Sequence, residues 1–269
     1  IFLRVITIGL AVCTAAAGSS IFTFASWTER SGGGNLFEFL NSGATHEFET
    51  GTGSSPVSIP ITFEFQSVSG PLPLALQGPI NAHMTISAPA TGVATTTPVC
   101  LNPPSCSNTK YFTTQPVGGT ITITSDTPVT GLDHNAADDI LLQVIFGASA
   151  GLQGFRGDGV ASLLSDSTSV GDSVSFTSDY LNFGLPVEEQ ISMSFTSLSP
   201  CFTRITNSCS ATATSPVGTY LRQFTANGSG TFSADPEPYT QAPEPMMMSL
   251  MGLGAIGLGL TGRLKRKKK

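Results

Sequence analysis

Short segments in which apolar and polar residues alternate constrain this sequence more than any other feature. Every second residue of 59–66 is apolar, which is typical of a strand with one buried face. The same alternation predicts strands at residues 120–124, 173–177 and 191–196. Residues 140–146 form an almost continuous apolar run, which is typical of a strand covered on both faces. These patterns predict a chain built from β-strands.

Composition excludes the main helical alternatives. Only 11% of the residues are charged, while 29 positions are glycine and 18 are proline, so too few charged side chains remain to cover a helical bundle or a coiled coil. The set of predicted strands is completed by weaker segments at residues 35–40, 80–87, 219–225 and 230–234. We therefore expect one all-β domain, an antiparallel β-sandwich over residues 35–234, with residues 88–104 as a loop insertion.

The amino-terminal residues have the features of a secretory signal peptide that lacks its start. No methionine begins the sequence, and Arg4 precedes a short apolar core at residues 5–12. This core is too short to span a membrane, and three alanines that follow it supply the small side chains of a cleavage site. We expect residues 1–17 to be the signal peptide, with cleavage as late as Ala25 as the alternative. Residues 18–34 then form a flexible lead-in.

The carboxyl-terminal residues have the features of a membrane segment. Residues 246–262 carry no charge, and at about 1.5 Å of rise per helical residue they span ~25 Å. A basic cluster follows, comprising Arg263, Lys265, Arg266, Lys267, Lys268 and Lys269. We expect a transmembrane helix at 246–262 and a cytoplasmic tail at 263–269, with the acidic middle of the chain outside the inner membrane. The proline-rich residues 235–245 form the linker to this anchor.

The same end of the chain resembles a known sorting signal. Pro243, Glu244 and Pro245 precede the apolar segment and the basic terminus, and this order resembles the PEP-CTERM signal that a membrane-embedded bacterial exosortase processes. The resemblance implies export, cleavage near the motif, and release or attachment at the cell surface or in an exopolysaccharide matrix. An earlier Pro-Glu-Pro at 236–238 is followed by polar residues, so we do not expect it to be the signal.

Four cysteines remain once Cys13, inside the apolar core of the signal peptide, is set aside. An even number of cysteines in an exported domain favours disulfides, and four cysteines allow three connectivities. We expect the two local pairs, Cys100 with Cys106 and Cys201 with Cys209, because the residues between them can turn. A four-cysteine zinc site uses closer spacing, and we predict no cofactor.

Charge and ligand patterns limit what the chain can bind. All 18 carboxylates lie between Glu29 and Glu244, against five lysines and arginines in that segment, so we expect no nucleic-acid partner. The densest group of oxygen ligands comprises Asp133, Asn135, Asp138 and Asp139. The group lacks the glycine and the final glutamate of an EF-hand, so we expect a solvated turn rather than a calcium site.

Two motifs match functional signatures without their usual context. Residues 147–151, Gly-Ala-Ser-Ala-Gly, match the nucleophile elbow of serine hydrolases, but every histidine precedes Ser149, and we expect a turn of small residues. The sequence spacing of His134, Asp138 and Ser149 does not by itself exclude a catalytic triad in a different chain order. Residues 156–158 spell Arg-Gly-Asp, a cell-adhesion tripeptide that an exposed glycine-rich loop would display.

The remaining titratable residues of interest are two adjacent glutamates and two histidines. Glu188 and Glu189 would point to opposite faces of a strand, so they do not form the carboxylate pair of a glycosidase. We expect His46 and His83 to be ordinary strand residues rather than ligands.

Taken together, the patterns predict an exported bacterial surface or extracellular-matrix protein with a structural or adhesive, non-catalytic role. Exosortase is the expected processing partner, and the inner membrane holds the precursor before processing. The alternative is a carbohydrate-binding module of the envelope or exopolysaccharide matrix, although Trp27 is the single tryptophan and sugars commonly contact aromatic faces. A secreted hydrolase is the third hypothesis.

Overall fold

The computed structural model describes residues 21–30, 34–53, 55–68, 70–101, 106, 109–129, 139–167, 173–184, 188–204, 209–210 and 219–238. The signal peptide predicted at 1–17, the sorting motif at 243–245, the apolar segment 246–262 and the basic tail 263–269 lie outside these residues. Within the described ranges no helix is long and apolar enough to cross a membrane.

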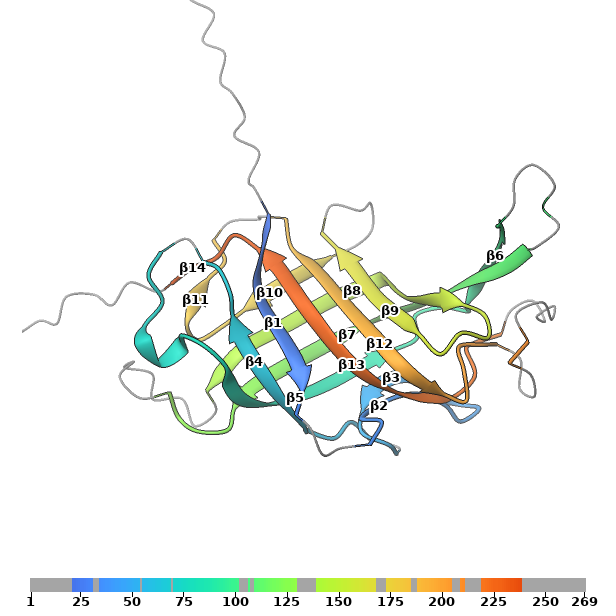
Figure 1. Cartoon of the computed structure of the whole chain (residues 1–269), viewed down its shortest axis with the longest axis horizontal. Helices are drawn as coiled ribbons and strands as arrows, with labels where there is room; N and C mark the ends of the chain where they lie inside the picture. Colours follow the sequence, from blue (N-terminus) through green and yellow to red (C-terminus); the bar gives the residue numbers. More distant parts are fainter. Residues whose placement is uncertain are drawn as a thin grey trace, which may run out of the picture.

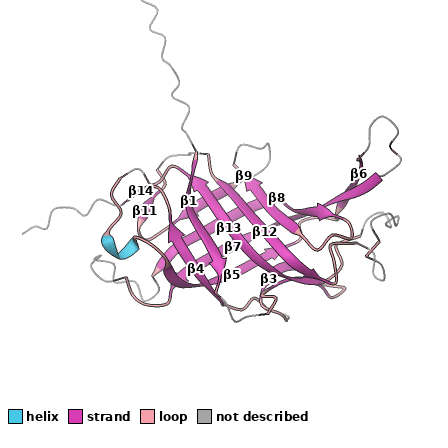
Figure 2. Cartoon of the chain, viewed as in Figure 1, coloured by secondary structure: helices cyan, strands magenta, loops and turns pink. Residues whose placement is uncertain are grey.

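The described chain consists of β-strands joined by loops and one 3₁₀ turn, η1 (Leu74–Leu76) (Figure 2). The strands are β1 (Phe22–Glu29), β2 (Phe37–Asn41), β3 (His46–Thr50), β4 (Ile59–Phe65), β5 (Ile80–Pro89), β6 (Thr95–Cys100), β7 (Thr109–Ser125), β8 (Ile140–Phe155), β9 (Ala161–Asp166), β10 (Val174–Thr177), β11 (Leu181–Asn182), β12 (Gln190–Ser199), β13 (Phe224–Ala234) and β14 (Glu237–Pro238). The prediction of an all-β fold is confirmed.

A single antiparallel sheet contains all of these strands except β11 and β14, which pair with each other. Its strand order is β1-β4-β5-β3-β2-β13-β12-β9-β8-β7-β6, with β10 paired to β8. Two further pairings, β1 with β13 and β5 with β7, return the sheet to itself. Figure 1 shows the result as two crossing layers, with β4, β1, β13, β12 and β9 in front of β7 and β8. The layers are therefore parts of one continuous hydrogen-bonded sheet.

The alternating segments form strands because alternation places their apolar side chains in the space between the layers. In β4 every second residue is buried, beginning with Ile59, and β12 follows the same rule from Ile191 to Phe195. The strand predicted at 140–146 is longer and is not covered on both faces, since Ile145 is 53% exposed.

Phenylalanine side chains from many of the strands meet in the core, among aliphatic residues. The ring centroids of Phe24 in β1 and Phe176 in β10 lie 5.4 Å apart, which joins the front layer to the rear one. Phe195 of β12 contacts Phe37 of β2 at 5.3 Å and Phe48 of β3 at 4.8 Å. Because burying one such ring contributes roughly 1.5–3 kcal/mol, these contacts contribute strongly to the cohesion of the core.

We predicted that residues 18–34 form a flexible lead-in, and this prediction is wrong for Phe22–Glu29, which form β1. This strand pairs with both β4 and β13, and Phe24 and Trp27 are buried in the core. Strict alternation is broken there because the register shifts between Thr23 and Ala25. Cleavage of a signal peptide after Ala25 would divide β1, so the later of the two predicted sites is incompatible with this fold.

Three other boundaries differ from the sequence prediction. The predicted loop insertion at 88–104 contains β6, which forms a hairpin with β7 that projects at one end of the molecule (Figure 1). The strand predicted at 219–225 begins only at Phe224 and continues as β13. The predicted linker 235–245 begins within the fold, since β14 pairs with β11.

Both predicted local cysteine pairs are present. Cys100 and Cys106 lie 5.0 Å apart at their Cα atoms, and Cys201 and Cys209 lie 5.9 Å apart, each pair within disulfide distance. Cys100 ends β6 and is opposite the first residue of β7, so this disulfide closes the β6–β7 hairpin.

Replacing Gly230 with alanine should destabilise the fold, because an added Cβ would lie 2.6 Å from Trp27 Nε1 and 3.0 Å from Met193 Cγ. We expect a loss of about 1–3 kcal/mol in the free energy of unfolding, measured by urea denaturation. Gly53→Ala is the matched control, since a Cβ there meets no atom within 4 Å. Equal stability of the two variants would contradict this account of the core.

Candidate functional site

The predicted calcium-ligand group is only partly within the described residues. Asp133, Asn135 and Asp138 lie outside them. Asp139 is 9% exposed, and its Oδ2 accepts a hydrogen bond from the Val129 N–H at 2.8 Å. Asp139 therefore does not belong to a solvated turn, and its carboxylate holds the backbone of Val129, which follows β7, near the start of β8. In the part of the chain that the structure describes, no group of three histidine, cysteine or acidic side chains is placed to hold a metal ion.

The hydrolase motif does not adopt its functional geometry. Residues 147–151 lie inside β8, which continues to Phe155, and Ala150 and Gly151 pair with Val117 and Pro116 of β7. A nucleophile elbow requires a sharp strand-to-helix turn, so both the elbow and the predicted small-residue turn are wrong. His134 and Asp138 of the open triad lie outside the described residues.

The adhesion tripeptide is not displayed on an exposed loop. Arg156 is 1% exposed, and its guanidinium carbon lies 4.9 Å from the centre of the Tyr111 ring. Asp158 forms an ion pair with Lys110 at 3.6 Å. Because a receptor must reach the arginine, this fold does not present residues 156–158 as an adhesion motif.

The adjacent glutamates lie just before β12 rather than within a strand, and they differ in burial. Glu188 is exposed, whereas Glu189 is 8% exposed and accepts a hydrogen bond from the Phe176 N–H at 3.3 Å. Burial raises the pKa of Glu189 to about 7, and the Phe176 N–H opposes that change. His46 and His83 lie in β3 and β5, as expected of strand residues.

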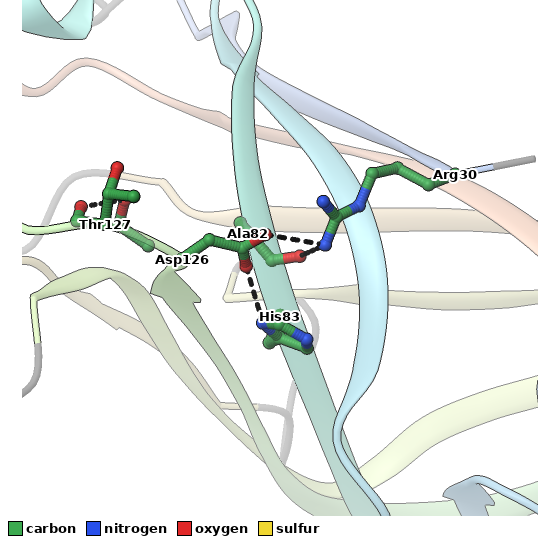
Figure 3. A network of polar contacts seen from close by, with 6 residues as sticks. Arg30, Ala82, His83, Asp126 and Thr127 are labelled. Atoms are coloured by element: carbon green, nitrogen blue, oxygen red, sulfur yellow. Dashed lines mark hydrogen bonds and ion pairs between the residues drawn. The ribbon is translucent and has the colours of Figure 1, made fainter.

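Three residues distant in the sequence form a charged network at one edge of the sheet. Asp126, directly after β7, lies 2.8 Å from Arg30 Nη2 and 2.5 Å from His83 Nδ1 (Figure 3). Arg30 also donates from Nη2 to the carbonyl of Ala82 at 3.3 Å. No sequence spacing indicates this network, because three separate elements supply its members. Asp126 orients the imidazole of His83 as a catalytic aspartate would, but among the described residues no nucleophile is hydrogen-bonded to that ring.

A second polar cluster consists of the carboxylates Glu38, Glu47 and Glu49. Glu38 of β2 is opposite Glu49 of β3 and accepts hydrogen bonds from the Gly53 N–H and the Gln223 side chain. Glu49 is 1% exposed, and neither of its oxygens has a hydrogen-bond partner among the described residues. Burial, followed by the charges of Glu47 and Glu38, raises the pKa of Glu49 to about 7.

A shallow pocket of about 460 Å³ is lined by residues of β7, β8, β9, β12 and β13, most of them on the outer face of the sheet. These five strands are neighbours in the strand order. We call it the outer pocket. It is lined by Thr114, Gly151, Gln153, Leu164, Ser165, Asp166, Gln190, Ile191, Ser192 and Ser233. Its volume falls within the range of about 300–1,000 Å³ usual for small-molecule sites. Strand register assembles it, which is why no local motif predicts it.

Comparison with protein-family models, with curated proteins and with solved structures finds no match to this chain. Inferences about function therefore depend on the two polar clusters, the outer pocket and the sequence of the chain ends. The network around Asp126 and the cluster around Glu49 are held within the fold, whereas the outer pocket opens to solvent.

The Arg30–Asp126 ion pair should contribute more to stability than the Lys110–Asp158 ion pair. A double-mutant cycle of Arg30→Ala and Asp126→Ala, measured by urea unfolding, should give a coupling energy of about 0.5–1 kcal/mol. The matched control cycle, Lys110→Ala with Asp158→Ala, should give almost none, because that pair is longer and more exposed. Equal coupling in the two cycles would contradict this ranking.

Glu49 should make the protein less stable as the pH rises. In the unfolded chain the carboxyl loses its proton near pH 4.5, but in the fold it keeps the proton to about pH 7, so stability falls across this window. Glu49→Gln should therefore raise the free energy of unfolding by roughly 1–3 kcal/mol at pH 8 and little at pH 4. Urea unfolding at both pH values tests this, with the exposed Glu188→Gln as control. A gain that is equal at both pH values would rule out titration of Glu49 as the cause.

Proposed function

We propose that this protein is an exported structural or adhesive component of a bacterial surface or extracellular matrix, and that an exosortase processes it. The observation that carries the proposal is the order of three features at the carboxyl terminus. The Pro-Glu-Pro motif at 243–245 precedes the apolar segment 246–262, and the basic residues 263–269 end the chain.

The end of the folded domain supports this choice of motif. The first Pro-Glu-Pro, at 236–238, is held by the fold, because Glu237 and Pro238 pair with Asn182 and Leu181. The second motif follows a few residues beyond this last strand. A processing enzyme needs accessible backbone, so the pairing of the first motif in a sheet makes it the poorer substrate of the two.

The cysteine pairs support export. Two pairs at disulfide distance favour an oxidising compartment, because disulfides persist outside the cytoplasm. We interpret the ectodomain as a β-sandwich whose two layers are joined at their edges, and we expect it outside the inner membrane after cleavage of the signal peptide. Exopolysaccharide of the surrounding matrix is its proposed partner.

A non-catalytic role agrees with the geometry of the hydrolase motif. Ser149 belongs to a continuous strand, and His83, which Asp126 orients, lies on a different strand, β5. A carbohydrate-binding role is the second candidate, and the outer pocket is the observation that favours it. The two roles are compatible in a matrix protein.

Processing in a host with active exosortase should yield a mature protein that lacks residues 246–269. Mass spectrometry of surface-exposed or released protein should find a carboxyl terminus close to Glu244. Replacing Pro243, Glu244 and Pro245 with alanine should trap the uncut precursor in the membrane fraction.

The first Pro-Glu-Pro provides a matched control for this experiment. Glu237→Ala changes an exposed glutamate in the same tripeptide context, and it should leave processing unchanged, whereas Glu244→Ala should slow it. Mature wild-type protein that retains Lys269 would show that the segment is a permanent anchor and that the sorting assignment is wrong.

A further inference from the structure

We propose that the outer pocket binds an uncharged saccharide unit, as in a neutral polysaccharide chain. This inference rests on the proposed function for its biological setting, because a matrix protein meets polysaccharide at high local concentration. The class of ligand follows from the residues that line the pocket.

The pocket is built from three cross-strand rows of residues. Thr114 is opposite Gln153 in the first row. Leu164 lies between Gly151 and Ser192 in the second. The third row comprises Asp166, Gln190 and Ser233. Neighbouring residues within a row are about 5 Å apart, and successive rows are about 7 Å apart. A ligand that contacts two rows must therefore be about the size of a small ring and must carry several polar groups around it.

The charge of the lining excludes anionic ligands. None of the ten lining residues is a lysine, arginine or histidine, and Asp166 is the single ionisable side chain among them. A phosphate, sulfate or uronic acid group would therefore meet a carboxylate and, among these ten residues, no cation. The pocket is also a poor site for apolar ligands, because Leu164 is its only large exposed apolar side chain.

The polar groups suit hydroxyl-rich ligands. Within the described part of the chain, the side chains of Gln153 and Gln190 form no hydrogen bond to the protein. Each carboxamide has an N–H donor and a carbonyl acceptor. One carboxamide can therefore bind two neighbouring hydroxyl groups of a sugar, donating to one and accepting from the other. The hydroxyl of Ser192 adds a further donor and acceptor beside them.

Leu164 and Gly151 give the pocket its floor and its apolar contact. Leu164 is 41% exposed, and its side chain can cover the C–H face of a sugar ring without an aromatic residue. Gly151 lets the side chain of Thr114 pack close to the backbone of β8, since an added Cβ would lie only 3.0 Å from Thr114 Cγ2. With no aromatic ring in the lining, we expect single-site affinities near the millimolar range.

The test is to titrate the full-length chain in detergent with neutral tetrasaccharides of glucose, mannose or galactose. Isothermal titration calorimetry or ligand-observed NMR measures the binding. At least one of these should bind, and the double variant Gln153→Ala/Gln190→Ala should weaken its binding at least tenfold. Ser194→Ala is the matched control, because Ser194 is the next outward-facing residue of β12 but does not line the pocket. It should change affinity less than twofold.

Three results would overturn the proposal. The first is no detectable binding of any neutral tetrasaccharide at about 10 mM, a concentration at which a site with a Kd of about 1 mM would be mostly occupied. The others are equal loss of binding in the double variant and in Ser194→Ala, and stronger binding of oligouronates than of neutral sugars. Circular dichroism and urea unfolding confirm that each variant is folded. Carboxyl-terminal processing of the same variants, measured in cells, separates the two proposals. Normal processing without sugar binding would overturn the pocket assignment alone, and sugar binding with Lys269 retained would overturn the sorting assignment alone.

Discussion

Burial of phenylalanine side chains between two crossing layers is the interaction on which the rest of this structure depends. The described chain has no α-helix to cover a sheet, so each layer must cover the other. The ring contacts of Phe24, Phe176 and Phe232 join β1, β10 and β13 across the core. The pairing of β1 with β13 then protects strands that would otherwise present open edges.

Because the core uses the inward positions of the strands, the outward positions carry small polar side chains. Along β12 the exposed residues include Ser192 and Ser194, and on β13 their partners are Thr231 and Ser229. This surface is polar without being strongly charged, which is the chemistry on which the proposed binding of a neutral sugar depends. The charged network of Asp126 instead lies at the ends of strands, where it joins β1, β5 and β7.

Glu49 is an exception to the rule that inward positions are apolar and outward positions are polar and exposed, because its carboxylate is buried. It lies on the face opposite Phe48, but the neighbouring Glu38 and the segment around Gly53 help to cover it. A buried acid with no hydrogen-bond partner in the described chain stabilises the fold less than a neutral amide would. The pocket and this carboxylate are on different strands, so the pH dependence of stability is expected to be independent of the proposed binding of a sugar.

Local patterns in the sequence determined the all-β class, most strand positions, the two short-range cysteine pairs and the proposed export and sorting signals, because each depends on residues close together in the chain. The tertiary structure alone decided that β1 belongs to the core, since its bulge at Thr23 and Ala25 disguises the alternation. It also decided which distant residues meet, as at Arg30, His83 and Asp126, and which line the outer pocket. The physical reason is strand register: a shift of one residue would turn every side chain to the opposite face, and register is set by long-range packing that no single segment encodes.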